Sequence, residues 1–160
     1  MAQHREVSPL DDIIDSRDLL AHIAALESDR EDLENAVSDA EEQLDNTLGD
    51  GEFNGEPLAL AKFLLAEWLD DDDGGILLAA LIVFRDEAEN ASGEALKDGA
   101  MLVRDSYFED HARAEAEECC NMSNADHWPF NCIDWEQAAH ELQYDYSSCK
   151  FDGVTYWVRS

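Results

Sequence analysis

The sequence predicts an α+β protein that is mostly helical, and three patterns support this prediction. Apolar residues recur every three or four positions over residues 16–47, which is typical of one long amphipathic helix. Two strongly apolar runs, 58–70 and 76–91, are joined by the turn DDDDGG and predict a helical hairpin. Near the C-terminus, an Asp-Gly step between two strand-forming runs indicates a β-hairpin. We expect three consecutive segments: the long acidic helix (1–50), a loop with the helical hairpin (51–99), and a C-terminal α+β segment (100–160).

The first element is predicted to be a coiled-coil-like helix that starts at Ser16. Ser16 suits the N-cap position, while Asp15 and Asp18 suit the positive end of the helix dipole. No Gly or Pro occurs between Ser16 and Leu48, and only Arg30 interrupts the apolar seam. Such a stripe must be buried on a returning helix or on a partner chain. The predicted dimer or helix-packing seam consists of Leu19, Ile23, Leu26, Leu33, Val37, Ala40 and Leu44.

The middle of the chain is predicted to be a loop followed by apolar helices. Residues 46–57 are rich in Gly and Asn and include a Pro, which indicates a loop. The runs 58–70 and 76–91 leave little polar surface, so we expect both to form core, with the long helix packed on them. After a glycine-flanked break at 93–99, helical spacing resumes and predicts a helix over 100–118.

The C-terminal third is expected to combine a short helix with the β-hairpin. Residues 133–144 fit an amphipathic helix with Asp134 near its start and an apolar stripe of Ile133, Ala138 and Leu142. The two strands flank Asp152-Gly153, a strong signal for a two-residue turn. Because two strands alone are only marginally stable, the hairpin must pack on helices or join another sheet.

The charge of the chain excludes several functions. The sequence has 39 acidic and 10 basic residues, a formal net charge of −29 with a pI near 4.1. Direct binding to nucleic acid or to an anionic membrane depends on Lys and Arg, so both are excluded. The longest apolar stretch, Ile76 to Phe84, is shorter than the roughly 20 residues of a membrane span. The N-terminus has no apolar core of the signal-peptide kind, so we expect a cytoplasmic protein.

No pattern in the sequence indicates catalysis or a cofactor. Motifs for phosphate-binding loops, dinucleotide binding, zinc proteases and serine hydrolases are absent, and the five histidines are scattered. We expect His111 and His140 to be surface or half-buried residues, and the cysteines to be buried or idle thiols. A zinc site remains an open alternative, and it would have to use an irregular set such as Cys120, His127, Cys132 and Cys149.

The density of acidic residues indicates imitation of a nucleic acid. The segment 27–45 carries nine carboxylates over roughly 28 Å of helix, about one every 3 Å, which compares with one phosphate per 3.4 Å along a DNA strand. A basic groove built for phosphates would attract such a surface. The predicted phosphate-mimicking acids are Glu27, Asp29, Glu31, Asp32, Glu34, Asp39, Glu41, Glu42 and Asp45, the turn Asp70, Asp71, Asp72 and Asp73, and Asp86, Glu87 and Glu89.

The C-terminal third also resembles a known family. It contains Tyr107-Phe108 in an acidic stretch, then Ile133-Asp134-Trp135-Glu136 with Ala138-Ala139 and Leu142, then Asp145-Tyr146 and an aromatic strand with Tyr156. This order resembles the C-terminal region of ArdA-type antirestriction proteins and related small phage, prophage or plasmid proteins. The resemblance covers about residues 104–159.

The resemblance implies an acidic, dimeric DNA mimic that occupies the DNA-binding groove of type I restriction-modification enzymes. ArdA proteins have further α/β domains upstream, whereas this chain has a long helix and an apolar hairpin there. The anti-defence class is therefore better supported than the particular target, and a CRISPR effector complex, which holds nucleic acid in a basic channel, is an equally suitable one. The alternative function is a non-catalytic acidic coiled-coil adaptor whose charge serves solubility alone.

Overall fold

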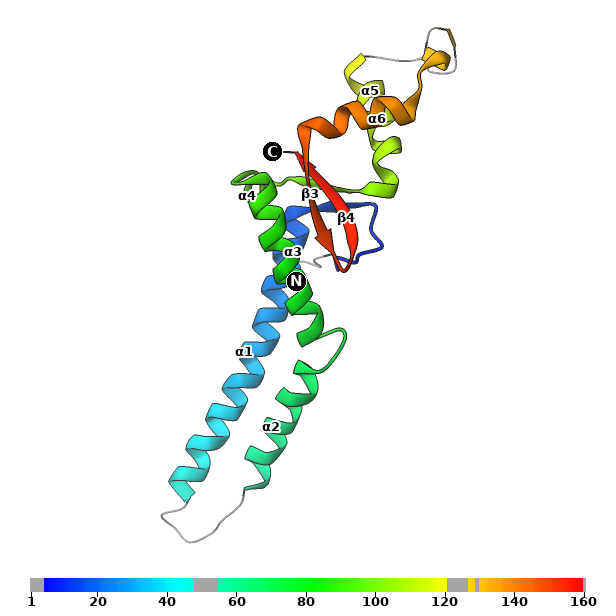
Figure 1. The fold of residues 1–160 in the computed structure, drawn as a ribbon. Helices are drawn as coiled ribbons and strands as arrows, with labels where there is room; N and C mark the ends of the chain where they lie inside the picture. The colour runs from blue at the N-terminus through cyan, green and yellow to red at the C-terminus, as the bar shows by residue number, and fades with distance from the viewer. Residues whose placement is uncertain (1–4, 48–54, 121–126, 129, 160) are drawn as a thin grey trace. The chain divides into compact units, whose positions relative to one another are not determined.

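The computed structural model describes residues 5–47, 55–120, 127–128 and 130–159, and it confirms the mostly helical α+β class (Figure 1). Residues 48–54 of the predicted loop 46–57 lie outside the described residues. The elements in chain order are β1 (Ile13–Asp15), α1 (Ser16–Thr47), α2 (Glu56–Leu69), α3 (Gly75–Ser92), α4 (Ala95–Asp98), β2 (Met101–Arg104), α5 (Phe108–Cys120), α6 (Trp135–Leu142), β3 (Tyr146–Phe151) and β4 (Val154–Arg159). Short 3-10 turns cover Asp105–Tyr107, Phe130–Cys132 and Gln143–Asp145.

The chain divides into two compact units whose bounds differ from the three consecutive segments expected from the sequence. Unit 1 combines residues 1–20 with 83–160, and unit 2 consists of residues 21–82. The N-terminal residues belong with the C-terminal half because β1 pairs with β2. Helices α1 and α3 each contribute residues to both units.

Unit 2 is built on the long helix predicted from residue 16. Its apolar seam is buried at Ile23 and Leu26, and Ala40 is buried further along. Leu33, Val37 and Leu44 are half-buried. The seam therefore packs within the chain most closely in its first half, where Leu19 of unit 1 is also fully buried.

Helix α2 does not form the core that its composition predicts. None of its side chains is buried. Leu58, Ala61, Leu65 and Trp68 are half-buried, whereas Leu60, Phe63, Leu64 and Leu69 are exposed. Among the residues that the structure describes, no element of unit 2 covers the side chains of Leu60, Phe63, Leu64 and Leu69, which therefore remain in water. For α3 the prediction is correct at Leu78, Leu81, Phe84 and Ala88, which are buried, although Ile76 is exposed.

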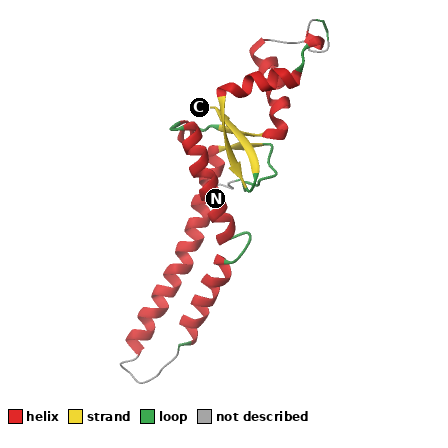
Figure 2. Ribbon diagram, in the orientation of Figure 1, coloured by secondary structure: helices red, strands yellow, loops and turns green. Residues whose placement is uncertain are grey.

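Unit 1 contains a four-stranded antiparallel sheet with the strand order β1-β2-β4-β3 (Figure 2). The predicted helix over 100–118 is wrong in its first part, because Met101–Arg104 forms strand β2 and the helix starts at Phe108. In β2 the adjacent residues Leu102 and Val103 face opposite sides of the sheet, and both are fully buried. Residues 101–104 form a strand and not a helix because they pair with β1 on one side and with β4 on the other.

The predicted C-terminal hairpin is confirmed as β3 and β4. Phe151 pairs with Val154 across the turn, and Tyr146 pairs with Arg159 at the far end. Asp152 and Gly153 both have positive φ, 48° and 79°, as a tight turn of the mirror-image type requires. The hairpin joins the sheet through β2, which provides the additional strands that it needs for stability.

Helices cover both faces of the sheet. On one face Phe84 stacks on Phe151 with ring centroids 4.7 Å apart and meets Tyr156 at 5.4 Å. On the other face, Phe108 and Ala112 of α5 and Ala139 of α6 pack with Val103. Tyr107, Leu142, Tyr146 and Trp157 surround this second cluster.

The starts of α6 and α1 test the capping residues predicted from the sequence. Asp134 caps α6 as expected, because its carboxylate accepts a hydrogen bond from the Gln137 N–H at 3.1 Å. Of the predicted apolar stripe, Leu142 packs on the core and Ala138 is half-buried beside the buried Ala139, whereas Ile133 precedes the helix and is exposed. At α1, the Ser16 hydroxyl donates to the Leu96 carbonyl at 2.6 Å instead of capping the helix, and the Asp15 carboxylate accepts from the Arg17 N–H at 2.9 Å.

We predict that Tyr156→Phe lowers the free energy of unfolding by about 1–2 kcal/mol. The Tyr156 hydroxyl lies 2.7 Å from the Asp11 carbonyl and 3.2 Å from the Pro9 carbonyl, so it fastens the N-terminal segment to β4. Burial raises the pKa of Tyr156 to about 12, which keeps the hydroxyl a neutral donor. Urea denaturation followed by circular dichroism measures the change. Tyr144→Phe at an exposed position is the control, and equal stability of the two variants would contradict the prediction.

Candidate functional site

The acids predicted to imitate phosphates in residues 27–45 all lie on α1 within unit 2. Eight of the nine are exposed and Glu27 is half-buried. Because this segment is one uninterrupted helix, the sequence spacing becomes a real spacing of about 1.5 Å per residue along an axis. The predicted density of carboxylates is therefore present in the folded chain.

Helical geometry sorts these acids into two groups. At about 100° per residue, six of them fall within an arc of roughly 100° on one side of α1. We call this group the acidic stripe, and it consists of Glu27, Glu31, Glu34, Glu41, Glu42 and Asp45. Asp29, Asp32 and Asp39 lie further round the helix. The apolar seam occupies the remaining side, so most of these acids face solvent, while Glu41 lies close enough to α2 to pair with Lys62.

Basic residues are scarce in unit 2. Its described residues, 21–47 and 55–82, include 15 acidic and 2 basic side chains, a net charge of −13. The two cations form ion pairs at exposed positions, Arg30 with Glu34 at 3.5 Å and Lys62 with Glu41 at 2.9 Å. Exposed pairs of this kind contribute about 0–1 kcal/mol each, so they neutralise little of the field.

Unit 1 has more basic residues near its acids than unit 2 has. Its described residues include 21 acidic and 8 basic side chains, and the cations are distributed over the whole unit. Seven ion pairs are formed: Arg5–Asp11, Arg17–Asp15, Arg85–Asp86, Lys97–Glu89, Arg104–Asp12, Arg113–Glu117 and Arg159–Glu115. The Arg17 guanidinium donates a hydrogen bond to Asp15 that lowers the pKa of this carboxyl. The described residues of unit 1 therefore also have a net charge of −13, but their ratio of acidic to basic side chains is lower than in unit 2, and seven of their eight cations form ion pairs.

The acidic turn Asp70–Asp73 is exposed at all four residues and also lies in unit 2. The Asp71 carbonyl accepts hydrogen bonds from the N–H groups of Gly74 and Ile76, both at 3.2 Å. Carboxylates are favourable just before α3 but unfavourable at the C-terminal end of α2, where Asp70 lies. Helix capping therefore explains only part of this turn.

The last three predicted acids do not join the others. Asp86, Glu87 and Glu89 lie in unit 1, and each has a partner there. The Glu87 carboxylate accepts a hydrogen bond from the Lys150 N–H of edge strand β3 at 2.7 Å. Asp86 and Glu89 form the ion pairs with Arg85 and Lys97. All three residues are exposed, and each also makes a local contact in unit 1.

Unit 1 contains a hollow of about 450 Å³ that the sequence did not indicate. His111 and Tyr146 line it, with the imidazole Nε2 3.1 Å from the phenol oxygen. Arg159 lies over the Tyr146 ring at 5.7 Å and within 3.8 Å of Glu115. Burial lowers the pKa of His111 and raises that of Tyr146. These residues are far apart in sequence and follow no motif, so only the fold brings them together.

The cysteines differ in their surroundings. Cys119, Cys120 and Cys132 are exposed, whereas Cys149 is buried. Burial raises the pKa of the Cys149 thiol to about 12, with a further contribution from Glu87. Within the described ranges, no group of three or more His, Cys, Asp or Glu side chains is arranged to hold a metal ion. In the same part of the chain, no helix has the length and apolar character needed to cross a membrane.

Comparisons with protein-family models, curated proteins and solved structures give no match to this chain. The likeness to ArdA-type proteins therefore rests on the residues quoted from the C-terminal third.

We predict that iodoacetamide labels Cys119, Cys120 and Cys132 in the native protein but leaves Cys149 unmodified. The first three side chains are accessible, while Cys149 is buried and its raised pKa keeps the thiolate population very small at pH 8. Mass spectrometry of peptides after labelling, with and without urea, measures the difference. Native labelling of Cys149 at the rate of the other three would contradict the buried position.

We predict that His111 makes folding less favourable as the pH falls. Its folded pKa lies below its unfolded value of about 6.5, so its stabilising contribution is complete above that value and is lost at lower pH. Wild-type protein should therefore lose more stability than His111→Asn between pH 7.5 and 5, as measured by urea denaturation. His140→Asn, at an exposed position, should follow the wild type. Identical pH profiles for wild type and His111→Asn would contradict the assignment.

Proposed function

We propose that this protein is an anti-defence inhibitor that acts as an acidic DNA mimic. It occupies the nucleic-acid-binding groove of a bacterial restriction-modification enzyme or CRISPR effector complex in the cytoplasm of the host cell. The observation that supports this proposal is the exposed carboxylate surface of unit 2, where 15 acidic side chains face only 2 basic ones.

The spacing of these charges suits a groove built for phosphates. Along α1 the acids of residues 27–45 recur about every 3 Å, close to the phosphate spacing of one DNA strand. A basic cleft focuses its field on such a surface, which accelerates encounter and makes binding sensitive to salt. The rigid helix presents the charges in a fixed array, as a duplex does.

The cost of the charge also supports a functional explanation. Solubility of a small domain requires a net charge of only about 2–8, and repulsion within a larger excess destabilises the folded state. Unit 2 has a net charge of −13 in its described residues alone. A surface that repels itself this strongly is explained by a cationic partner that relieves the repulsion on binding.

The resemblance to ArdA-type proteins is consistent with the same class. It covers residues 104–159 of unit 1, and it implies a homodimer and type I restriction-modification enzymes as targets. Unit 2 has no counterpart among the upstream domains of ArdA proteins. We therefore assign the carboxylate surface of unit 2 to target binding, and leave the C-terminal region with the dimer that the resemblance implies.

We predict that reversing four acids of α1, Glu31→Lys, Asp32→Lys, Glu42→Lys and Asp45→Lys together, weakens inhibition at least about 10-fold, which corresponds to 1.4 kcal/mol. All four residues are exposed and lie outside the ion pairs of unit 2. A purified type I restriction-modification enzyme and a Cas9-type effector serve as targets, and displacement of a labelled DNA fragment measures binding. Higher salt should weaken the wild-type protein as well.

A matched control separates local from overall charge. Reversing Glu6, Glu94, Glu118 and Glu136 to Lys changes the net charge equally, but these exposed residues lie in unit 1. This control should keep most of the inhibition. Unchanged inhibition by the variant with four reversed α1 acids would contradict the mimic proposal.

The adaptor alternative gives the opposite pattern. If unit 2 acts through its apolar seam alone, Leu33→Asp or Val37→Asp abolishes function by loss of a dimer, and added salt has little effect. Light scattering of the same variants reports the oligomeric state directly.

A further inference from the structure

Helix α2 leaves a groove open on unit 2. Ten of its 14 residues are apolar, yet none is buried. A helix of this length is marginal in water on its own and depends on burial of its apolar face for stability. Leu60 and Phe63 are 59% and 60% exposed, which is unusual for large apolar side chains that lie close together.

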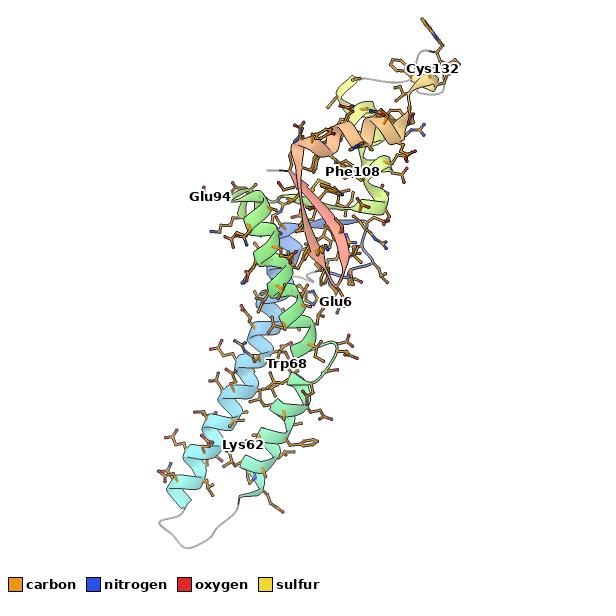
Figure 3. The ribbon with its side chains drawn as sticks, viewed as in Figure 1. Glu6, Lys62, Trp68, Glu94, Phe108 and Cys132 are labelled. Carbon is orange, nitrogen blue, oxygen red and sulfur yellow. The ribbon has the colours of Figure 1, made fainter. Side chains whose placement is uncertain are left out.

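The groove is formed by two adjoining hollows between α1 and α2. One of about 830 Å³ is lined by Phe63, Leu64 and Trp68, the last labelled in Figure 3, and extends to Asp70 and Asp71. The other, of about 380 Å³, extends towards Pro57 and Gln43. Leu33 and Leu64 line both hollows, so the two form one continuous groove.

The shape of the groove suits a helix. From Pro57 to Asp71 it follows α2 for about 21 Å, the length of roughly four helical turns. Ala36, Ala40 and Ala61 line its narrower part, and such small residues leave room for the ridge of an incoming helix. Leu60 and Leu64 provide the apolar contacts.

The charges at the edge of the groove select the occupant. Asp39, Glu67, Asp70 and Asp71 line it, and no lining residue is basic. A second copy of unit 2 would bring another net charge of −13 to this face and would be repelled. A helix with an apolar stripe flanked by Lys and Arg would satisfy both the apolar floor and the acidic edge.

We propose that the groove between α1 and α2 binds a cationic amphipathic helix of the target protein. This inference rests on the proposed function in one respect, that the target is a basic nucleic-acid-binding protein. Helix binding in the groove uses apolar contacts, whereas nucleic-acid mimicry uses exposed acids of α1 that do not line the groove, so the two can be measured separately.

The test uses the full chain and a synthetic probe. The probe is an 18-residue peptide with Leu at i, i+3, i+4 and i+7 spacing and Lys on the opposite face. A scrambled peptide of the same composition has the same charge but no apolar stripe. Fluorescence anisotropy at 0.5 M NaCl, where screening suppresses simple charge attraction, should show at least about 10-fold tighter binding of the amphipathic peptide. Equal affinity for both peptides overturns the proposal.

Variants locate the binding on the protein. Leu60→Gln with Leu64→Gln removes two apolar groups from the groove and should weaken the amphipathic peptide about 10-fold or more. Leu69→Gln with Ile76→Gln is the matched control, because these exposed residues of unit 2 lie outside both hollows. Circular dichroism verifies that each variant folds. Equal loss in both pairs, or no loss in either, overturns the assignment to the groove.

Trp68 provides a second and local measurement. It lines the groove, so the bound peptide should shift its fluorescence to shorter wavelength, and Trp68→Phe should remove that shift. Light scattering without peptide tests the competing occupant. A dimer that dissociates on Leu60→Gln with Leu64→Gln would assign the groove to a second copy and overturn the proposal. If the groove variants no longer bind the peptide but still displace DNA from the target, the groove is the peptide site and nucleic-acid mimicry does not depend on it. If they bind the peptide but no longer displace DNA, the assignment of helix binding to these residues is overturned.

Discussion

Electrostatic repulsion within unit 2 is the constraint on which the rest of this structure depends. Helices α1 and α2 and the turn Asp70–Asp73 carry its 15 acidic side chains, with only Arg30 and Lys62 to offset them. Each fully buried Leu or Ile side chain contributes about 1.5–3 kcal/mol, and the described seam of α1 in unit 2 has only Ile23, Leu26 and Ala40 in the buried class. The apolar contacts of unit 2 must therefore hold its helices together against a field that opposes them. Counterions or a cationic partner strengthen the unit by reducing that field.

Unit 1 has the same net charge of −13 in its described residues, but spreads it over more residues and has a larger core. Seven of its eight described basic residues form ion pairs, and its sheet is covered by helices on both faces. Phe84 and Phe108 lie on opposite sides of the sheet and anchor two separate aromatic clusters. Asp86, Glu87 and Glu89 are acidic and close in sequence to unit 2, but each has a local partner in unit 1.

The sequence predicts the elements whose signals are local. The long helix follows from an uninterrupted apolar spacing, and the hairpin follows from Asp152-Gly153, because a single pair of residues determines the turn. Strand β2 could not be predicted from local sequence, because its four residues fit a helical spacing and form a strand only by pairing with β1 and β4. The exposure of α2 could not be predicted either, because apolar composition predicts burial and does not show whether another element covers the helix. Among the site residues, the acids of α1 were predictable from density alone. Contacts between distant parts of the sequence, such as the ion pair of Arg104 with Asp12 and the hydrogen bond from the Lys150 N–H to Glu87, were not.

The two surfaces of unit 2 suit different parts of a binding reaction. Exposed carboxylates act over about one Debye length, near 10 Å at 0.1 M salt, and therefore mainly raise the association rate and exclude acidic partners. After contact, solvent screens much of this attraction, so solvent-exposed charge pairs add little to the stability of the complex. Apolar groups such as Leu60 and Leu64 act only in contact, and their burial slows dissociation. An inhibitor that must displace a long polyanion from its enzyme requires both properties, fast capture and slow release. A charged helix beside an unfilled apolar groove provides the two within a single hairpin of 55 described residues, 21–47 and 55–82.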